Sequence, residues 1–199
     1  ADLLELAVAA GLRALVAEER AVVVQLDRQV PAVQVVLDDG AHHTRRPLRA
    51  QRDRAPAAVV VALVRDLVGR EWTPEADAAA RPLAQSDLIV VTPYNAQQVT
   101  VEEALTAAGF DRVPVGTVDK FQGQEAAVAI VSLAASSGRD APRGLEFLLL
   151  QNRLNVAVSR AEHTAYIVYG TGLLDDLPRT PDGVARLSAF ARLVGADRP

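Results

Sequence analysis

The chain has 199 residues, half of them hydrophobic but only 4% aromatic, so it can bury one substantial core packed mostly by Ala, Val and Leu. It contains no Cys and three scattered His, which excludes disulfides and thiolate metal sites, and the net charge of −4 gives no overall case for nucleic-acid binding. No segment reaches the ~18 apolar residues of a membrane span and none has the layout of a signal peptide, so we expect a cytoplasmic protein without a membrane partner.

The first third of the chain is irregular, and we expect residues 1–55 to form an N-terminal segment distinct from the rest. Apolar residues at helical spacing predict a helix over 2–20. VVVQL (22–26) and VQVVL (33–37) predict two strands, closed by the turn Asp39-Gly40. The Arg-rich stretch 42–54 is interpreted either as a solvated loop or as a local nucleic-acid contact. Because Met is absent, we leave open that the chain is part of a longer protein.

From residue 56 onward the pattern predicts one α/β domain. An apolar helix is expected over 57–67, ended by Gly69, and a linker with two prolines over 70–87. Short apolar strands then alternate with helices: strands at 88–92, 113–118, 126–132 and 164–169, helices at 95–108, 146–160 and 183–193, and a loop over 135–144. This alternation is typical of a doubly wound parallel sheet with helices on both faces. Ligands bind at the carboxyl ends of such strands, where we expect the polar clusters to fall.

The first polar cluster is TPYNAQ (92–97), at the end of a predicted strand. Pro93 fixes the backbone there, and Asn95 is expected to cap the following helix. The free N–H groups of such a helix start can hold an anion, for example a backbone phosphate. A capped strand-to-helix turn without any ligand explains the same residues.

The second cluster, VGTVDKFQGQE (115–125), contains the only lysine of the chain, Lys120. A glycine, Gly123, lies among polar side chains, where it lets main chain approach a ligand closely. A charge and two amides beside such a glycine suit sugar hydroxyls or phosphates. A turn that only reversed the chain would need fewer hydrogen-bonding groups. The polar residues of the cluster are Thr117, Asp119, Lys120, Gln122, Gln124 and Glu125.

The third cluster is NRLNVAVSRAEH (152–163), on a predicted helix. Leu154, Val156 and Val158 can face the core, which leaves Arg153 and Arg160 for other surfaces. Arg160 lies near the end of this helix, where the helix dipole favours a cation in any case. Taken alone, this cluster therefore implies no site.

Together, in this order and spacing, the clusters resemble the C-terminal RecA-like domain of superfamily 1 helicases, in the 5′-to-3′ branch of RNA-surveillance and replication-type enzymes. The resemblance covers about residues 57–195, whereas residues 1–55 show no match. EFL (146–148) before the last motif also occurs in bacterial RecB-like helicase–nuclease proteins, which look closest. TPYxxQ is matched by Thr92, Pro93, Tyr94 and Gln97, VDxFQGxE by Val118, Asp119, Phe121, Gln122, Gly123 and Glu125, and RLNVAxSRA by the residues from Arg153 to Ala161.

The resemblance implies that ATP binds in a cleft between two RecA-like domains, of which residues 56–199 form the second. Arg160 would be the arginine finger on the γ-phosphate. Gly123, Gln124 and Glu125 would contact the nucleotide, with Glu125 on the ribose hydroxyls. Single-stranded DNA or RNA would lie along a floor formed by Thr92, Pro93, Tyr94, Asn95, Thr117 and Asp119, with Lys120 as a weaker candidate.

The chain departs from the family pattern in its catalytic parts. It has no Gly-Lys-Ser/Thr phosphate loop, since Lys120 lies between Asp119 and Phe121, and no apolar strand ends in the Asp-Glu pair expected for magnesium. A second arginine, expected in a Tyr-Arg-Met-His-like motif, is also missing. We therefore expect no metal site here and no hydrolysis by the isolated chain. The first RecA-like domain, in the same or another chain, would supply the phosphate loop and hold the Mg of ATP.

Two other interpretations stay open. The chain could be a stand-alone degenerate domain that binds single strands or a partner without ATP turnover. It could also be an unrelated α/β fold in which the motifs are accidental.

Overall fold

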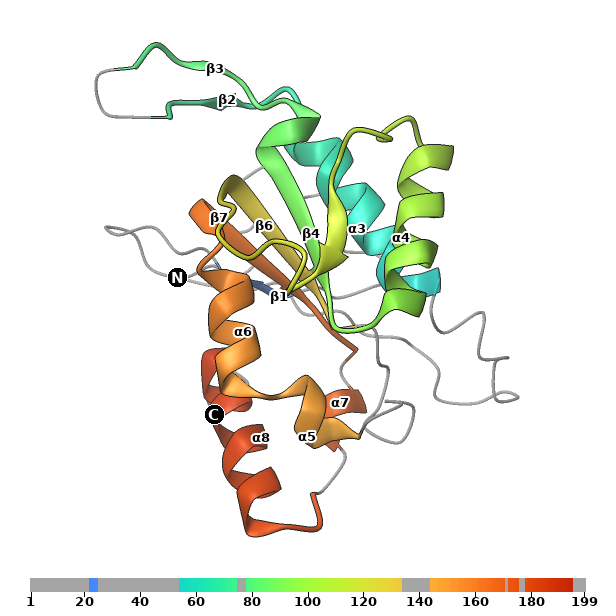
Figure 1. Ribbon diagram of the computed structural model, residues 1–199, viewed down its shortest axis with the longest axis vertical. Helices are drawn as coiled ribbons and strands as arrows, with labels where there is room; N and C mark the ends of the chain where they lie inside the picture. The colour runs from blue at the N-terminus through green and yellow to red at the C-terminus, as the bar shows by residue number, and fades with distance from the viewer. Residues whose placement is uncertain are drawn as a thin grey trace, which may run out of the picture.

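The computed structural model describes residues 22–24, 54–74, 78–133, 144–170, 172–175 and 178–194, and its centre is a five-stranded sheet in the order β1-β7-β6-β4-β5 (Figure 1). The parallel strands are β4 (Leu88–Thr92), β5 (Val115–Thr117), β6 (Ala126–Ser132) and β7 (Ala161–Val168). The edge strand β1 (Val22–Val24), part of the predicted strand over 22–26, pairs antiparallel with β7. The predicted helix over 2–20, the strand over 33–37 and most of the Arg-rich stretch lie outside the described residues.

Helices cover both faces of the sheet, as predicted for a doubly wound α/β domain. On one face, α3 (Arg54–Leu67) and α4 (Asn95–Ala107) enclose a core layer of mostly Val and Leu. The other face is covered by residues 118–125 and by α6 (Gln151–Val158). In Figure 1 the layer of α6 continues below the sheet into α5 (Leu145–Leu148), α7 (Gly172–Asp175) and α8 (Pro181–Leu193).

The central strands are buried along their whole length. Every residue of β4 and of β6 is buried, as strands must be when helices cover both faces of a sheet. The predicted bounds of both strands agree with the structure. The predicted helix over 95–108 is α4, and it ends before Gly109, whose φ of +84° is the left-handed conformation that glycine adopts after a helix.

Residues 70–87, predicted to be a linker, contain regular structure instead. β2 (Glu71–Trp72) and β3 (Arg81–Pro82) form a hairpin, and a 3-10 helix, η1 (Gln85–Asp87), follows. The hairpin projects beyond the amino end of β4 (Figure 1). The guanidinium of Arg81 donates to both carboxylate oxygens of Asp87, at 2.5 and 2.8 Å, and these hydrogen bonds lower the pKa of Asp87. The base of the hairpin is thus held by backbone hydrogen bonds of Leu83 to Gly69 and Arg70 together with this ion pair.

The helix predicted over 146–160 is broken into α5 and α6. Leu150 interrupts it with extended backbone, at φ −60° and ψ 109°. The break allows Leu149 before it and Leu154 after it to enter the same core layer, so packing overrides helical continuity. Val156, which was expected in the core, is 37% exposed.

The remaining differences are small shifts at the ends of elements. α8 begins before its predicted start at residue 183, because the hydroxyl of Thr180 accepts a hydrogen bond from the N–H of Gly183 at 3.0 Å and Pro181 is the first helical residue. β5 is shorter than the predicted strand over 113–118, and β7 begins earlier than residue 164. The short helix α7 was not predicted.

Tyr169, which directly follows β7, joins the sheet to α8. It is 1% exposed, and its ring meets that of Phe190 edge-on, with the centroids 5.1 Å apart. Its hydroxyl has no hydrogen-bond partner among the described residues. Burial raises the pKa of Tyr169 to about 12.

We expect Tyr169→Phe to keep the free energy of unfolding at neutral pH or raise it by up to ~1 kcal/mol, because the substitution removes a buried hydroxyl without a partner. Tyr169→Ala is the comparison, and it should lower the free energy of unfolding by ~3–5 kcal/mol through loss of the packed ring. Urea denaturation measures both. A Phe variant as unstable as the Ala variant would show that the hydroxyl is essential.

The same substitution should change stability at high pH. Unfolded Tyr titrates near pH ~10, so a folded pKa raised to about 12 makes the stability complete below pH ~10 and lowers it as the pH rises toward 12. Burial also raises the pKa of Tyr166 to about 12. The double variant Tyr166→Phe/Tyr169→Phe should therefore lose less free energy of unfolding over this pH range than wild type or Tyr169→Phe. Alkaline denaturation curves test this, and a double variant as sensitive as wild type would contradict it.

Candidate nucleotide and nucleic-acid site

The three polar clusters lie at two different edges of the sheet. Thr92 and Thr117 end β4 and β5 and are paired neighbours, so they lie at the carboxyl edge as predicted. Glu125 directly precedes β6, and Arg160 directly precedes β7, so both lie at the amino edge. The prediction that all three clusters fall at carboxyl ends is therefore wrong. Glu125 and Arg160 lie just before the chain enters β6 and β7, and parallel strands all begin at the amino edge of the sheet.

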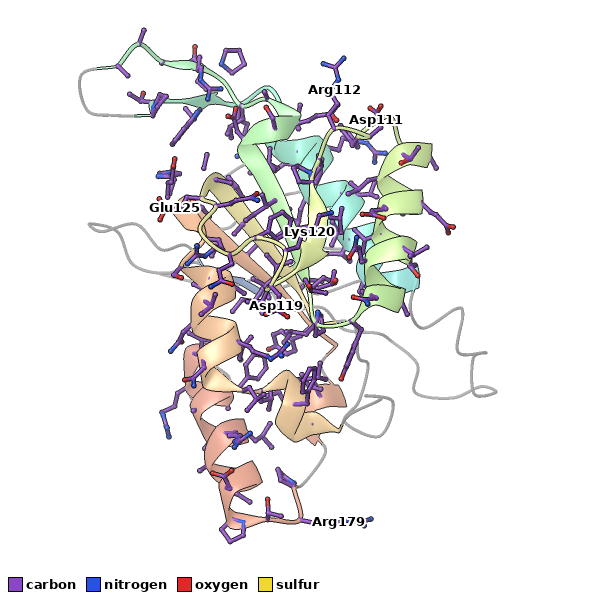
Figure 2. All side chains as sticks on the ribbon, in the orientation of Figure 1. Asp111, Arg112, Asp119, Lys120, Glu125 and Arg179 are labelled. Carbon is purple, nitrogen blue, oxygen red and sulfur yellow. The ribbon has the colours of Figure 1, made fainter. Side chains whose placement is uncertain are left out.

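One short segment, made largely of turns, connects the two edges. Only residues 118–125 separate β5 from β6, fewer than the dozen or so residues that a parallel connection usually needs. Phe121 in the middle is 1% exposed and packs into the core, while Asp119 and Glu125 are exposed. Figure 2 labels Asp119, Lys120 and Glu125 along this crossing. The segment thus carries polar side chains from the edge at Thr117 to the edge at Glu125.

The turn before β6 depends on Gly123. Its φ of +76° is left-handed, and a Cβ placed there would meet nothing within 4 Å. The backbone conformation itself therefore favours glycine, and the open space beside it leaves the main chain accessible. Gln124 and Glu125, which follow it, are exposed.

Arg160 faces this turn. Its Nη1 donates to the carbonyl of Gln124 and its Nε to the carbonyl of Val156, each at 3.2 Å. The main chain adds a bond from Ala126 N–H to the carbonyl of Arg160 at 2.9 Å. Arg160 is half-buried rather than enclosed in the core. The structure thus brings Arg160 beside the glycine turn that the sequence grouped with it.

At the carboxyl edge, the turn TPYN (92–95) leads into α4. Thr92 is 1% exposed and its hydroxyl donates to the carbonyl of Tyr94 at 3.3 Å, so its side chain shapes the turn from inside. Asn95 does not cap α4 as predicted. It is the first helical residue, the cap position is Tyr94, and among the described residues no side chain caps this helix start. Asn95 is exposed and Pro93 is half-buried.

Gln97 is a buried polar residue to which the sequence analysis gave no role. It is 3% exposed, and its Nε2 lies 3.4 Å from the hydroxyl of buried Ser132 at the end of β6. Together with Thr92, these residues are three of the four buried polar residues in the described part of the chain. They fix the start of α4 to the ends of β4 and β6. The sequence signal for this contact was the match of Gln97 to the last position of TPYxxQ, in the first turn of a predicted helix.

The side chain of Lys120, although exposed, folds back on β5. Its Nζ donates to the carbonyl of Val115 at 2.6 Å. A Cβ on Gly116 would lie 2.3 Å from Cδ of Lys120, so the lysine stem occupies the space that the glycine leaves. A phosphate contact by Lys120, which the resemblance gave as a weaker candidate, would have to compete with the bond to Val115.

The described residues offer single carboxylates rather than a metal site. Among them, no group of three or more His, Cys, Asp or Glu is placed to hold a metal ion. Asp119 and Glu125 are therefore not assigned as magnesium ligands. That another domain holds the metal stays a prediction. In the part of the chain that the structure describes, no helix is both long and apolar enough to cross a bilayer.

The parallel sheet with helices on both faces, and the motifs at its edges, define a helicase-type α/β domain of the RecA-like kind. A family model described as "AAA domain" matches residues 14–171, which is most of the chain, and the chain belongs to this AAA domain family. The match begins well before residue 57, where the motif resemblance begins. The N-terminal third therefore shares more with the family than its motifs indicated.

Curated relatives agree with the helicase-type class. The chain is 35% identical over 118 residues to the NFX1-type zinc finger-containing protein 1 homolog of Caenorhabditis elegans, covering 56% of the chain and 4% of that protein. It is 38% identical over 86 residues to the DNA polymerase alpha-associated DNA helicase A of Schizosaccharomyces pombe, covering 43% and 12%. It is 40% identical over 78 residues to the DNA replication ATP-dependent helicase/nuclease DNA2 of Homo sapiens, covering 39% and 7%. The chain thus spans only a small part of each relative.

We expect Gly116→Ala to lower the free energy of unfolding by ~1–3 kcal/mol, because the new methyl group displaces Lys120 and breaks its bond to Val115. In a Lys120→Ala background the same substitution should be neutral or slightly stabilising, since alanine is less flexible than glycine. The four proteins form a double-mutant cycle measured by urea denaturation. Equal effects of Gly116→Ala in both backgrounds would contradict a direct contact.

Proposed function

We propose that this chain is the second motor domain of an ATP-dependent helicase that acts on single-stranded DNA or RNA. The observation that carries the proposal is the hydrogen bond from Arg160 to the carbonyl of Gln124. It joins the glycine turn to the arginine of the last motif, the two parts that the helicase resemblance assigns to the nucleotide. Residues 56–199 form the motor domain in this proposal, and the role of residues 1–55 is left unassigned.

The amino edge of the sheet is the nucleotide side. Arg160 retains a second terminal nitrogen beyond its bonds to the main chain, and this nitrogen places positive charge beside the γ-phosphate as negative charge develops during transfer. Gly123 and Gln124 bring main chain close to the nucleotide, and the exposed carboxylate of Glu125 accepts hydrogen bonds from the ribose hydroxyls. The phosphate loop and the magnesium ligands come from a first RecA-like domain in the same or another chain.

The carboxyl edge is the single-strand side. The start of α4 has no side-chain cap among the described residues, so its N–H groups suit a backbone phosphate. Tyr94, Asn95, Thr117 and Asp119 line this edge. Pro93 and buried Thr92 hold the turn in shape rather than making the contact through exposed atoms. Contacts of this kind need few charges, which is compatible with the net charge of −4.

A module that binds strands without ATP turnover is the alternative, and the Arg160 contact argues against it, because such a module has no use for a γ-phosphate sensor. A Gly-Lys-Thr motif in frame upstream of this sequence would support the motor. We further propose that the domain works in the cytoplasm and is closest to bacterial RecB-like helicase–nuclease proteins. One curated relative, human DNA2, is itself named a helicase/nuclease.

In the protein that joins this domain to a phosphate-loop domain, Arg160→Ala should lower ATP turnover by ~10³-fold or more, as loss of an arginine finger does in related hydrolases. Single-strand affinity should be nearly unchanged, because Arg160 lies at the opposite edge from the strand-binding turn. Steady-state ATPase assays and filter binding measure the two quantities.

Two other arginines sharpen this experiment. Arg153→Ala tests the other arginine of the same motif. If Arg160→Ala hydrolyses ATP normally and Arg153→Ala does not, Arg153 rather than Arg160 is the arginine finger. Arg179→Ala is the matched control, because Arg179 is exposed at the far end of the domain (Figure 2). It should turn over ATP as wild type does.

Thr117→Ala should weaken single-strand affinity more than nucleotide affinity, since Thr117 ends β5 at the carboxyl edge. Filter binding with an oligonucleotide and titration with a nucleotide analogue give the two constants. Thr106→Ala, at an exposed position on α4, is the control. Equal loss of both affinities in Thr117→Ala would count against separate strand and nucleotide edges.

A further inference from the structure

A three-layer stack of side chains lies between the strand-binding turn and α6. The ring of Tyr94 stacks on that of Phe147, with centroids 5.7 Å apart and planes at 23°. The guanidinium carbon of Arg153 lies over Phe147, 4.7 Å from the ring centroid. Offset stacking and cation–π contact are both favourable geometries for these groups. Phe147 is therefore in contact with two residues that belong to different motifs.

Core packing does not account for Phe147. Leu145, Leu148 and Leu149 are the residues of this region that bury in the core layer below the sheet. Phe147 is half-buried and belongs to neither core layer. Its ring instead contacts both Tyr94 and Arg153. In the sequence Phe147 stands out only as part of EFL, and it has no role in the proposed function.

The stack is continuous with the nucleotide side through α6. Arg153 lies near the start of α6 and Arg160 lies two residues beyond its end, so the two are ~10 Å apart along the direction of the helix. Arg160 in turn donates to the carbonyl of Gln124. A displacement of Phe147 would therefore reach Arg153 at one end of α6, and Arg160, two residues beyond the other end, contacts the glycine turn.

Non-helical backbone bounds the short helix that carries Phe147. Gly144, directly before α5, has a left-handed φ of +77°, and Leu150, two residues after its end, has extended backbone. The position of α5 therefore depends on its buried leucines and on the contacts that Phe147 makes with Tyr94 and Arg153.

We propose that Phe147 is a positioning residue that couples single-strand binding at Tyr94 to nucleotide binding at the Arg160 side. The proposal rests on the proposed function. Because binding linkage is reciprocal, a strand that moves Tyr94 changes nucleotide affinity by the same factor as the nucleotide changes strand affinity. The ring provides the coupling, whereas the affinity for each ligand alone depends on other residues.

The test uses the protein that carries both RecA-like domains. Its affinity for an oligodeoxythymidine is measured with and without a non-hydrolysable ATP analogue, and the ratio of the two dissociation constants reports the coupling. We expect wild type to show a ratio of about five-fold or more. Phe147→Leu should bring the ratio close to one while each ligand alone binds as tightly as to wild type. Phe147→Tyr keeps an aromatic ring at this position and should show the wild-type ratio. Phe110→Leu, a half-buried phenylalanine on the α3 and α4 face, is the matched control and should keep it.

The other outcomes overturn the proposal. A wild-type ratio in Phe147→Leu would show that the stack carries no coupling. If Phe147→Leu loses affinity for both ligands and melts at a lower temperature, the role of Phe147 is purely structural. The same conclusion holds if Phe147→Tyr does not show the wild-type ratio. A wild-type protein that binds neither ligand would instead refute the proposed function, and with it the coupling.

Discussion

Two hydrogen bonds at the amino ends of β6 and β7 bring the glycine turn and Arg160 together. The guanidinium of Arg160 donates to the carbonyl of Gln124, 36 residues away in the sequence. The carbonyl of Arg160 accepts a hydrogen bond from the N–H of Ala126. Each bond contributes only ~1 kcal/mol. Pairing of the backbone supports this geometry, because Ala126 and Ala161 are partners at the starts of β6 and β7. The position of Arg160 therefore depends on the pairing of these two strands as well as on its own contacts.

Residues 118–125 cross from one edge of the sheet to the other and place polar residues at both edges. This connection consists of turns rather than a helix and lies against the sheet. Phe121 anchors it in the core, and Lys120 fixes its start by filling the space beside Gly116. Residues at one end of the segment therefore belong to the edge of Thr117, and residues at the other belong to the edge of Glu125. In the proposed motor, the same segment would contact both the strand and the nucleotide.

The few aromatic residues lie mainly where the sheet meets the layer of α5 to α8. The core on the α3 and α4 side is built mostly of Val, Leu and Ala, which suits close contact between helices and a sheet. Below the sheet, ring pairs make the contact instead: Tyr94 with Phe147, and Tyr169 with Phe190. Rings span larger gaps than aliphatic side chains. Their geometry is also directional, so the positions of α5 and α8 relative to the strands are specified by a small number of side chains.

The sequence by itself determined the central strands, α4, the α/β class and the order of the motifs, because burial periodicity and the glycines after helices act locally. It did not reveal the hairpin closed by Arg81 and Asp87, the break at Leu150, or the stem of Lys120 over Gly116. It also misplaced the glycine turn and Arg160 at the carboxyl edge. These features depend on side chains that meet only after the strands have paired and the two core layers have closed. Since such contacts join residues distant in sequence, no local pattern encodes them, and the tertiary structure alone decided them.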